Sequence, residues 1–467
     1  MPKFTMEPQQ VPQVHTKYRT IETAIPAPGA VEALNEMRQY EPVSMTGQPP
    51  VIWDKAIGYN VYDRWGNRWI DFSSGVVVAN AGHCNPEVQK AALDTISHGL
   101  MHSYIFPTEI RGKLEKRISE LVPIPDNRVF LLTTGAESTE CAIKLARTTG
   151  AARGGTKKIK IVTFDDCFHG RTMGSQMAGG TPSAKKWIVN VDKDFCQVPF
   201  PNAFKYEWAD ESRPDYSDQN CFAHFLAALK ERGIDPDEIA GIMTETFQGG
   251  WVQLMPSGFV KLLRKFCDEH GILLIFDEVQ AGFGRTGKLF GFMYADVTPD
   301  LICCGKGISS GMPLSCVVGR AEIMNQYGPN KMTSTHSGNP VCSAAALASI
   351  NYIMDHDLVG NAARLSKICE EKLKAMQKRF PDVIGFVSGC GLAWAAVFTK
   401  PGTKEIDPEL ATRVVELAMQ RGVLFFAPVG DGATLKVCPP LMIDDDALLE
   451  GLQVFEDAVA DAVKERQ

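Results

Sequence analysis

Short apolar segments alternate with amphipathic ones through the middle of the chain. The segments RVFLLTT, KIKIVTF, IAGIMTE, ILLIFDE and DLICCG have the length and apolar character of buried strands, whereas TECAIKLART and PSGFVKLLRKFCDEHG repeat their apolar positions with a helical period. Strands that alternate with helices are typical of a parallel sheet covered by helices on both faces. The pattern therefore predicts an α/β fold with a mostly parallel central sheet, and ligands of such sheets gather at the carboxyl ends of the strands.

The two ends of the chain have different patterns. The first forty-odd residues are rich in proline and polar groups, and we expect them to run over a neighbouring surface before the fold begins. The segment VIWDKAIGYNVYDRWGNRWIDFSSG predicts an antiparallel hairpin that turns at residues 63–67. Helical periods from residue 340 lead into strands near FVSGCGLAWAAVF and GATLKVCPPL.

We therefore predict a large domain at residues 96–345 and a small α+β domain built from both ends of the chain. Residues 1–95 would form the N-terminal segment and part of the small domain, and residues 346–467 would form its C-terminal part.

Composition narrows the class of protein. The chain has 467 residues, 45% of them hydrophobic, and a net charge of −7, which describes a globular protein with no basic surface for nucleic acid. Apolar runs stay far below the roughly 20 residues that span a bilayer, and the first residues contain no apolar signal core. The 13 cysteines include no CxxC pair. We therefore expect reduced thiols, no metal site, a cytoplasmic location and small-molecule partners.

Two residues at predicted strand ends indicate a particular chemistry. Asp277 ends the ILLIF strand, and Lys306 stands between two glycines directly after the LICC strand. A buried lysine readily forms Schiff bases with carbonyl compounds. An aspartate that faces a pyridinium nitrogen keeps the ring protonated as an electron sink. Together the two residues indicate a site for pyridoxal 5′-phosphate.

Other motifs at strand ends have both a functional and a purely structural interpretation. Gly135 and Ala136 open a helix after a strand, so their N–H groups can meet a phosphate, although such a junction alone is more commonly just a tight turn. Phe168 and Val279 can sandwich the pyridine ring, although Phe168 alone could be a core aromatic. Arg171 carries a planar fork that matches a carboxylate, although alone it could form a surface ion pair.

Taken together, these motifs resemble the class III, ornithine/4-aminobutyrate-type, aminotransferases of the fold type I superfamily. The resemblance runs from about Pro26 to the end of the chain, and its most specific pieces are DEVQAGFGRTG, the GKG lysine and SGNP. It implies a fold type I transferase in which Lys306 binds the cofactor aldehyde, Glu245 organises hydrogen bonds beneath the cofactor and Gln280 bonds its phenolate oxygen. Thr335 matches a threonine that reaches the cofactor phosphate of the partner, which implies a homodimer with shared active sites.

The chain departs from the family at positions that select substrates. Many relatives carry a gating glutamate where this chain has Gly250, an arginine for the α-carboxylate where it has Lys436, and often another arginine where it has Ser388. In those relatives the glutamate and the first arginine form a switch between ω-amino and α-carboxylate substrates. Lys436 supplies a mobile point charge instead of a fork. By the same resemblance, Arg171 would bind the carboxylate remote from the reacting amine.

The expected reaction is ping-pong transamination from an ω-amino acid or amine, such as 4-aminobutyrate, to pyruvate or 2-oxoglutarate. Lys306 would be the general base. Aminomutases, amino acid epimerases and decarboxylases of the same fold would use the same Lys306 and Asp277, and the need for a keto acid discriminates between them. A non-catalytic cofactor-binding module would need a nucleic-acid-binding region, and a purely structural protein would be expected to have lost one of the two residues.

Overall fold

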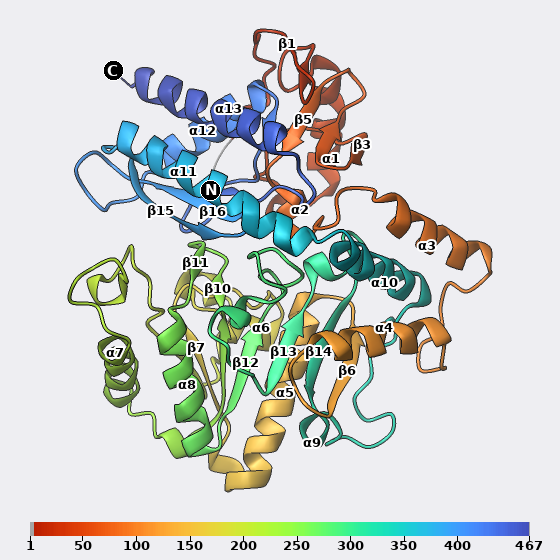
Figure 1. Cartoon of the computed structure of the whole chain (residues 1–467), viewed down its shortest axis with the longest axis vertical. Helices are drawn as coiled ribbons and strands as arrows, with labels where there is room; N and C mark the ends of the chain where they lie inside the picture. Colours follow the sequence, from red (N-terminus) through yellow and green to blue (C-terminus); the bar gives the residue numbers. More distant parts are fainter. Residues whose placement is uncertain (1–3, 467) are drawn as a thin grey trace.

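A seven-stranded sheet forms the centre of the computed structural model, which describes residues 4–466 (Figure 1). Its strands lie in the order β6 (Asn127–Leu132), β14 (Ser315–Arg320), β13 (Leu301–Cys304), β12 (Leu273–Asp277), β9 (Ile239–Glu245), β7 (Lys160–Phe164) and β8 (Phe195–Val198). Strand β14 is antiparallel to β6 and β13, and the remaining pairs are parallel. The predicted α/β fold and each predicted strand of this sheet are confirmed. Strands β8 and β14 were not anticipated.

Helices cover both faces of the sheet: α5 (Gly135–Gly154) on one face, and α7 (Asp218–Glu231) and α8 (Ser257–His270) on the other. Alternate residues of a central strand therefore enter two different cores. In β12, Leu273 and Ile275 pack on the α5 side, whereas Leu274 and Phe276 pack on the α7 and α8 side. Burial on both faces explains why the ILLIF segment is apolar throughout instead of alternating.

The other helices lie around the large sheet and above its carboxyl edge (Figure 1). They are α1 (Val31–Tyr40), α2 (Ser74–Val77), α3 (Pro86–Ser97), α4 (Glu109–Leu121), α6 (Met173–Ala178), α9 (Ala321–Met324), α10 (Pro340–Asp355), α11 (Leu358–Arg379), α12 (Pro408–Gln420) and α13 (Asp445–Lys464). The SGNP segment begins α10, because the Asn339 side chain accepts hydrogen bonds from two N–H groups of the first turn and proline follows it.

The N-terminal hairpin is confirmed, but the prediction for the residues before it was wrong. Strand β5 (Arg68–Asp71) pairs with β4 (Asn60–Tyr62), which pairs with β3 (Lys55–Ile57). The first forty residues do not merely cover a surface, because β2 (Thr20–Ile21) pairs with both β5 and β1 (Val14–His15). Ile21 and Ile25 are buried in the same core as Trp69. Strands of two residues are too short to produce a visible alternation in the sequence.

The two ends of the chain meet above the large sheet (Figure 1). Strand β17 (Val423–Leu424) pairs in parallel with β5 of the N-terminal segment. Next to it, the predicted C-terminal strands form an antiparallel sheet of β15 (Ile384–Cys390), β16 (Ala393–Phe398) and β18 (Thr434–Val437). A short ribbon of β10 (Phe247–Gln248) and β11 (Gln253–Leu254) faces this sheet. The domain boundaries near residues 95 and 345 stay a prediction.

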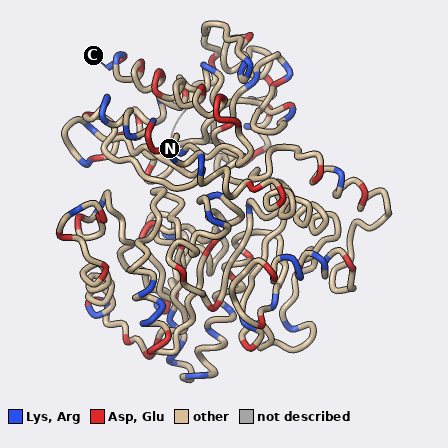
Figure 2. The backbone as a smooth tube through the Cα atoms, viewed as in Figure 1, with Lys and Arg blue, Asp and Glu red and all other residues tan. Residues whose placement is uncertain are grey.

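Charges of both signs are interspersed along the chain (Figure 2). Within residues 4–466, no helix has the length and apolar character needed to cross a membrane. All 13 cysteines are free thiols, most of them buried.

Candidate active site

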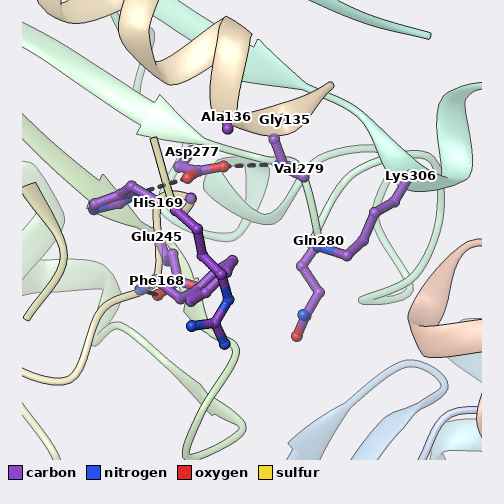
Figure 3. Close-up of a pocket in the computed structure, with 11 residues that line it drawn as sticks. Gly135, Ala136, Phe168, His169, Glu245, Asp277, Val279, Gln280 and Lys306 are labelled. Carbon is purple, nitrogen blue, oxygen red and sulfur yellow. Dashed lines mark hydrogen bonds and ion pairs between the residues drawn. The ribbon is translucent and has the colours of Figure 1, made fainter. Parts of the chain in front are cut away.

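A cavity of about 250 Å³ opens at the carboxyl ends of the central strands (Figure 3). Most of the residues that the sequence singled out line it, joined by two of their neighbours: Gly135, Ala136, Phe168, His169, Gly170, Arg171, Glu245, Asp277, Val279, Gln280 and Lys306. Sheet register explains this convergence. Glu245 and Asp277 end adjacent parallel strands and lie directly opposite each other, and Cys303 of β13 occupies the same row.

Asp277 is held at both carboxylate oxygens. His169 Nδ1 lies 2.7 Å from Oδ2, and the backbone N–H of Val279 donates to Oδ1 at 3.1 Å (Figure 3). His169 is fully buried; burial opposes its charge, but the neighbouring Cys167 and the hydrogen bond to Asp277 raise the pKa of His169 well above its usual value. The contact with His169 therefore fixes the orientation of the Asp277 carboxylate. Sequence reasoning missed His169, although it is adjacent to Phe168 in the same motif.

Glu245 fixes the backbone beneath the cavity. Its Oε2 accepts from the N–H of Phe168 at 3.0 Å, and its Oε1 accepts from the N–H of Gly249 at 3.0 Å. Complete burial raises the pKa of Glu245, although these two hydrogen bonds favour its ionised form. Glu245 therefore ties the loop after β7, which carries the Phe168 ring, to the segment that follows its own strand β9.

Lys306 follows β13 and enters the cavity from the side opposite Asp277 and His169 (Figure 3). Its backbone lies in the left-handed region at φ +45°, a conformation that costs a lysine roughly 1–3 kcal/mol. Burial lowers the pKa of Lys306, and the carboxylates of Asp277 and Glu245 oppose that shift. A lowered pKa increases the fraction of neutral amine, which is the form that attacks a carbonyl carbon or accepts a proton.

The first turn of α5 offers an anion-binding end. Thr134 caps the helix and forms a reciprocal capping box with Glu137. The N–H groups of Gly135 and Ala136 have no acceptor in the described part of the chain, and both residues line the cavity. A Cβ on Gly135 would lie 2.8 Å from Val279 Cγ1, so only glycine allows this close approach. These features suit a phosphate group.

Phe168 and Arg171 lie together at the opening of the cavity. The Phe168 ring is 49% exposed, and the guanidinium of Arg171 lies 5.4 Å from the ring centroid. Arg171 is exposed and has no carboxylate within ion-pair distance among residues 4–466. Its planar fork is therefore available to a ligand carboxylate.

Lys436 lies behind the cavity, not on its lining. Its side chain is buried and donates to Gln280 Oε1 at 2.8 Å. Burial lowers the pKa of Lys436 to about 8. Ser388 donates to the carbonyl of Val252 at 2.9 Å, and a Cβ at Gly250 would meet no atom closer than 3.7 Å.

Thr335 is exposed in the turn before α10 and does not line the cavity of its own chain. Its contact with a partner subunit stays a prediction.

The donor set fits pyridoxal 5′-phosphate. Free N–H groups suit the phosphate, an ionised carboxylate suits the pyridinium nitrogen, and a buried lysine suits the aldehyde. Between residues 4 and 466, no three His, Cys, Asp or Glu side chains gather in a way that could hold a metal ion.

Comparison with known proteins matches the chain to one protein family. The profile described as Aminotransferase class-III matches residues 43–459. The chain is 33% identical to the acetylornithine aminotransferase of Methanopyrus kandleri over 88% of this chain and 94% of that protein. It is 31% identical to the 4-aminobutyrate aminotransferase of Mycobacterium leprae over 95% and 98%, and 30% identical to the alanine/serine racemase of Pyrococcus horikoshii over 98% and 96%.

Among solved structures, the fold is similar to an amine transaminase from an uncultivated Pseudomonas species in its PLP-bound form. The TM-score is 0.82 at 27% identity, over 90% of this chain and 96% of that one.

Proposed function

Because the chain belongs to the class III aminotransferase family, we propose that it moves an amino group from an ω-amino acid or related amine to a 2-oxo acid in two half-reactions. The observation that carries the proposal is the convergence of Lys306, Asp277 and Glu245 on one cavity at the strand ends. These residues can perform proton transfer beside an electron sink.

Pyridoxal 5′-phosphate is the cofactor of this family, and when bound it supplies the electron sink that stabilises negative charge on the substrate carbon. Lys306 would hold its aldehyde, Asp277 its ring nitrogen, and Gly135 and Ala136 its phosphate. The His169 contact keeps the Asp277 carboxylate fixed.

Lys306 also performs the proton transfer. Its lowered pKa increases the share of its Nζ that is neutral amine, which is the form able to take a proton from the substrate carbon and return it to another carbon within reach. The carboxylates of Asp277 and Glu245 stabilise the ammonium that results from proton uptake.

Two cationic side chains would each bind one of the substrate carboxylates. Arg171 at the opening would bind the carboxylate remote from the donor amine, and Lys436 would bind the α-carboxylate of the keto acid. An ammonium has three N–H donors, and Gln280 takes one of them, which leaves two for a carboxylate. Since Gly250 supplies no gating glutamate, we propose a small acceptor such as pyruvate, or 2-oxoglutarate bound through Arg171.

We further propose a homodimer in a reducing compartment such as the cytoplasm. Thr335, the residue expected to reach the partner's cofactor phosphate, is exposed and therefore available to a second subunit. The free thiols support the choice of compartment.

A screen of amines and 2-oxo acids against the purified protein tests the proposal. Each half-reaction is followed separately by the absorbance of the bound cofactor, with Lys306→Ala as the inactive control. We expect the strongest donors to be ω-amino acids. Absence of any spectral change with every donor would reject amino transfer.

Racemisation or epimerisation of an amino acid is the second candidate, because the chain is 30% identical to the alanine/serine racemase of Pyrococcus horikoshii, close to its 33% identity to the acetylornithine aminotransferase. The same screen separates the two. A racemase inverts its substrate without consuming a keto acid, whereas an aminotransferase stops after the first half-reaction unless a keto acid is present.

A further inference from the structure

Lys436 and Gln280 form a contact between two segments that are 156 residues apart in the sequence. Lys436 lies on β18 of the C-terminal sheet, and Gln280 lies on the loop after β12 that also carries Asp277 and Val279. Lys436 is only 4% exposed, and its Nζ lies 2.8 Å from Gln280 Oε1. The contact therefore joins the C-terminal sheet to the loop that lines the cavity.

The chemistry of the two groups determines which end of the Gln280 side-chain amide faces Lys436. An ammonium can only donate, so the oxygen of Gln280 must face Lys436 and its NH₂ group must face away. Gly249 leaves room for the same oxygen, because a Cβ on Gly249 would lie 2.8 Å from Gln280 Oε1. Gln280 lines the cavity, and its NH₂ group has no acceptor among the described residues.

Lys436 has few other partners. No carboxylate lies within 4 Å of its Nζ in the described part of the chain, and the Phe426 ring centroid is 5.7 Å away. The charged or titratable groups that act on it from neighbouring elements are Cys438, Glu245, Lys306 and Arg285. The hydrogen bond to Gln280 is therefore its main fixed contact.

We propose that Lys436 is a positioning residue that holds Gln280 Oε1 and so presents the Gln280 NH₂ group as a donor to the ring oxygen of the cofactor. The inference rests on the cofactor part of the proposed function and is independent of the substrate. Without Lys436 the amide can rotate by half a turn and direct its oxygen toward the ring oxygen, which repels it.

The arrangement also makes the amide sensitive to pH. Burial, with a smaller effect from Lys306 and Arg285, lowers the pKa of Lys436 to about 8, while Cys438 and Glu245 oppose the shift. Below that pH the ammonium holds the amide oxygen. Above it, the neutral amine can accept as well as donate, and the orientation of Gln280 is no longer enforced.

A double-mutant cycle tests the proposal on the cofactor-loaded protein. The variants are Lys436→Met, which is close to isosteric, Gln280→Ala, and both together. The readout is the pH midpoint of the absorbance change of the bound cofactor, because a donor on the ring oxygen favours its ionised form. Loss of the Lys436 charge acts directly on this midpoint in both backgrounds, so the difference between the two shifts measures the part that acts through Gln280.

We expect Lys436→Met to shift the midpoint by about one pH unit more in the protein with Gln280 than in the Q280A protein. Lys436→Arg, which keeps the donor, should stay close to the wild-type midpoint. Shifts that agree within about 0.3 unit in the two backgrounds would overturn the proposal, because Lys436 would then act only through its charge. The spectral cycle needs no substrate, so a failed donor screen beside a positive cycle would reject the proposed function alone.

Discussion

The floor and the back wall of the cavity are built differently. The floor consists of Glu245, Asp277 and Lys306 at the carboxyl ends of three strands, and each carboxylate there has two fixed hydrogen-bond donors. The back wall, which lies behind the cavity lining, consists of Gly250, Ser388 and Lys436 from later loops and strands. There Lys436 has one neutral acceptor, Ser388 bonds to a backbone carbonyl and Gly250 has no side chain.

This difference suits the floor to the chemical steps and the back wall to the selection of substrates. A buried charge is tolerated only where hydrogen bonds or opposite charges compensate it, so the fully partnered floor can keep an ionised carboxylate beside a lysine of lowered pKa. The back wall contains few such constraints, and its side chains can change without disturbing the sheet. The positions at which the sequence is expected to depart from its family, Gly250, Ser388 and Lys436, all belong to the back wall.

Removal of the floor lysine should have the largest effect. Lys306→Ala removes both the cofactor-binding amine and the proton carrier, so we expect turnover to fall by about 10⁴-fold or more. The cofactor should still bind through its other contacts. Borohydride reduction of the wild-type protein should fix the cofactor on the Lys306 peptide, and exposed Lys288→Ala is the matched control. Fixation on any other lysine would contradict the assignment.

Asp277→Asn should have the next largest effect. The substitution keeps the size of the side chain but removes the charge that favours a protonated ring, so we expect roughly a thousandfold loss of turnover. Cofactor content, measured by absorbance after alkaline release, should be unchanged. Near-normal turnover at full cofactor content would show that another group protonates the ring.

Much of this floor could be predicted from the sequence. Strand ends are visible as the last residue of an apolar run, and parallel strands place their carboxyl ends at one edge, so Glu245, Asp277 and Lys306 were expected together. The role of His169 was not predicted, although its position beside Phe168 at a strand end was a usable signal.

The back wall could not be predicted in the same way. The Lys436–Gln280 contact depends on how the C-terminal sheet packs over the large one, and no local pattern records a pairing across 156 residues. The same reason explains why β2 was missed: its pairing with β5 is decided by distant partners, not by its own two residues.

At the opening, Arg171→Ala should have a smaller and more selective effect. We expect KM for ω-amino acids to rise by roughly 10- to 100-fold, which corresponds to the loss of a hydrogen bond to a charged group. Simple amines, which carry no carboxylate, should be nearly unaffected and provide the internal control. Both are measured in the first half-reaction alone. An equal rise for both kinds of donor would show that Arg171 does not bind the remote carboxylate.

The back wall should show the smallest effect, and that effect should depend on pH. Burial places the pKa of Lys436 at about 8, below the usual lysine value, so its ammonium form persists only up to that pH. A keto acid carboxylate needs the ammonium. Acceptor affinity in the second half-reaction should therefore be full below about pH 8 and fall by up to about tenfold as pH rises through it.

Two variants decide whether Lys436 causes this dependence. Lys436→Arg stays charged throughout, so its acceptor affinity should no longer fall near pH 8. Lys436→Ala should have weak acceptor affinity at every pH while donor affinity in the first half-reaction is retained. A fall in acceptor affinity near pH 8 that persists in Lys436→Arg must come from a group other than Lys436. That result would show that the titration of Lys436 in the back wall does not control binding of the acceptor carboxylate.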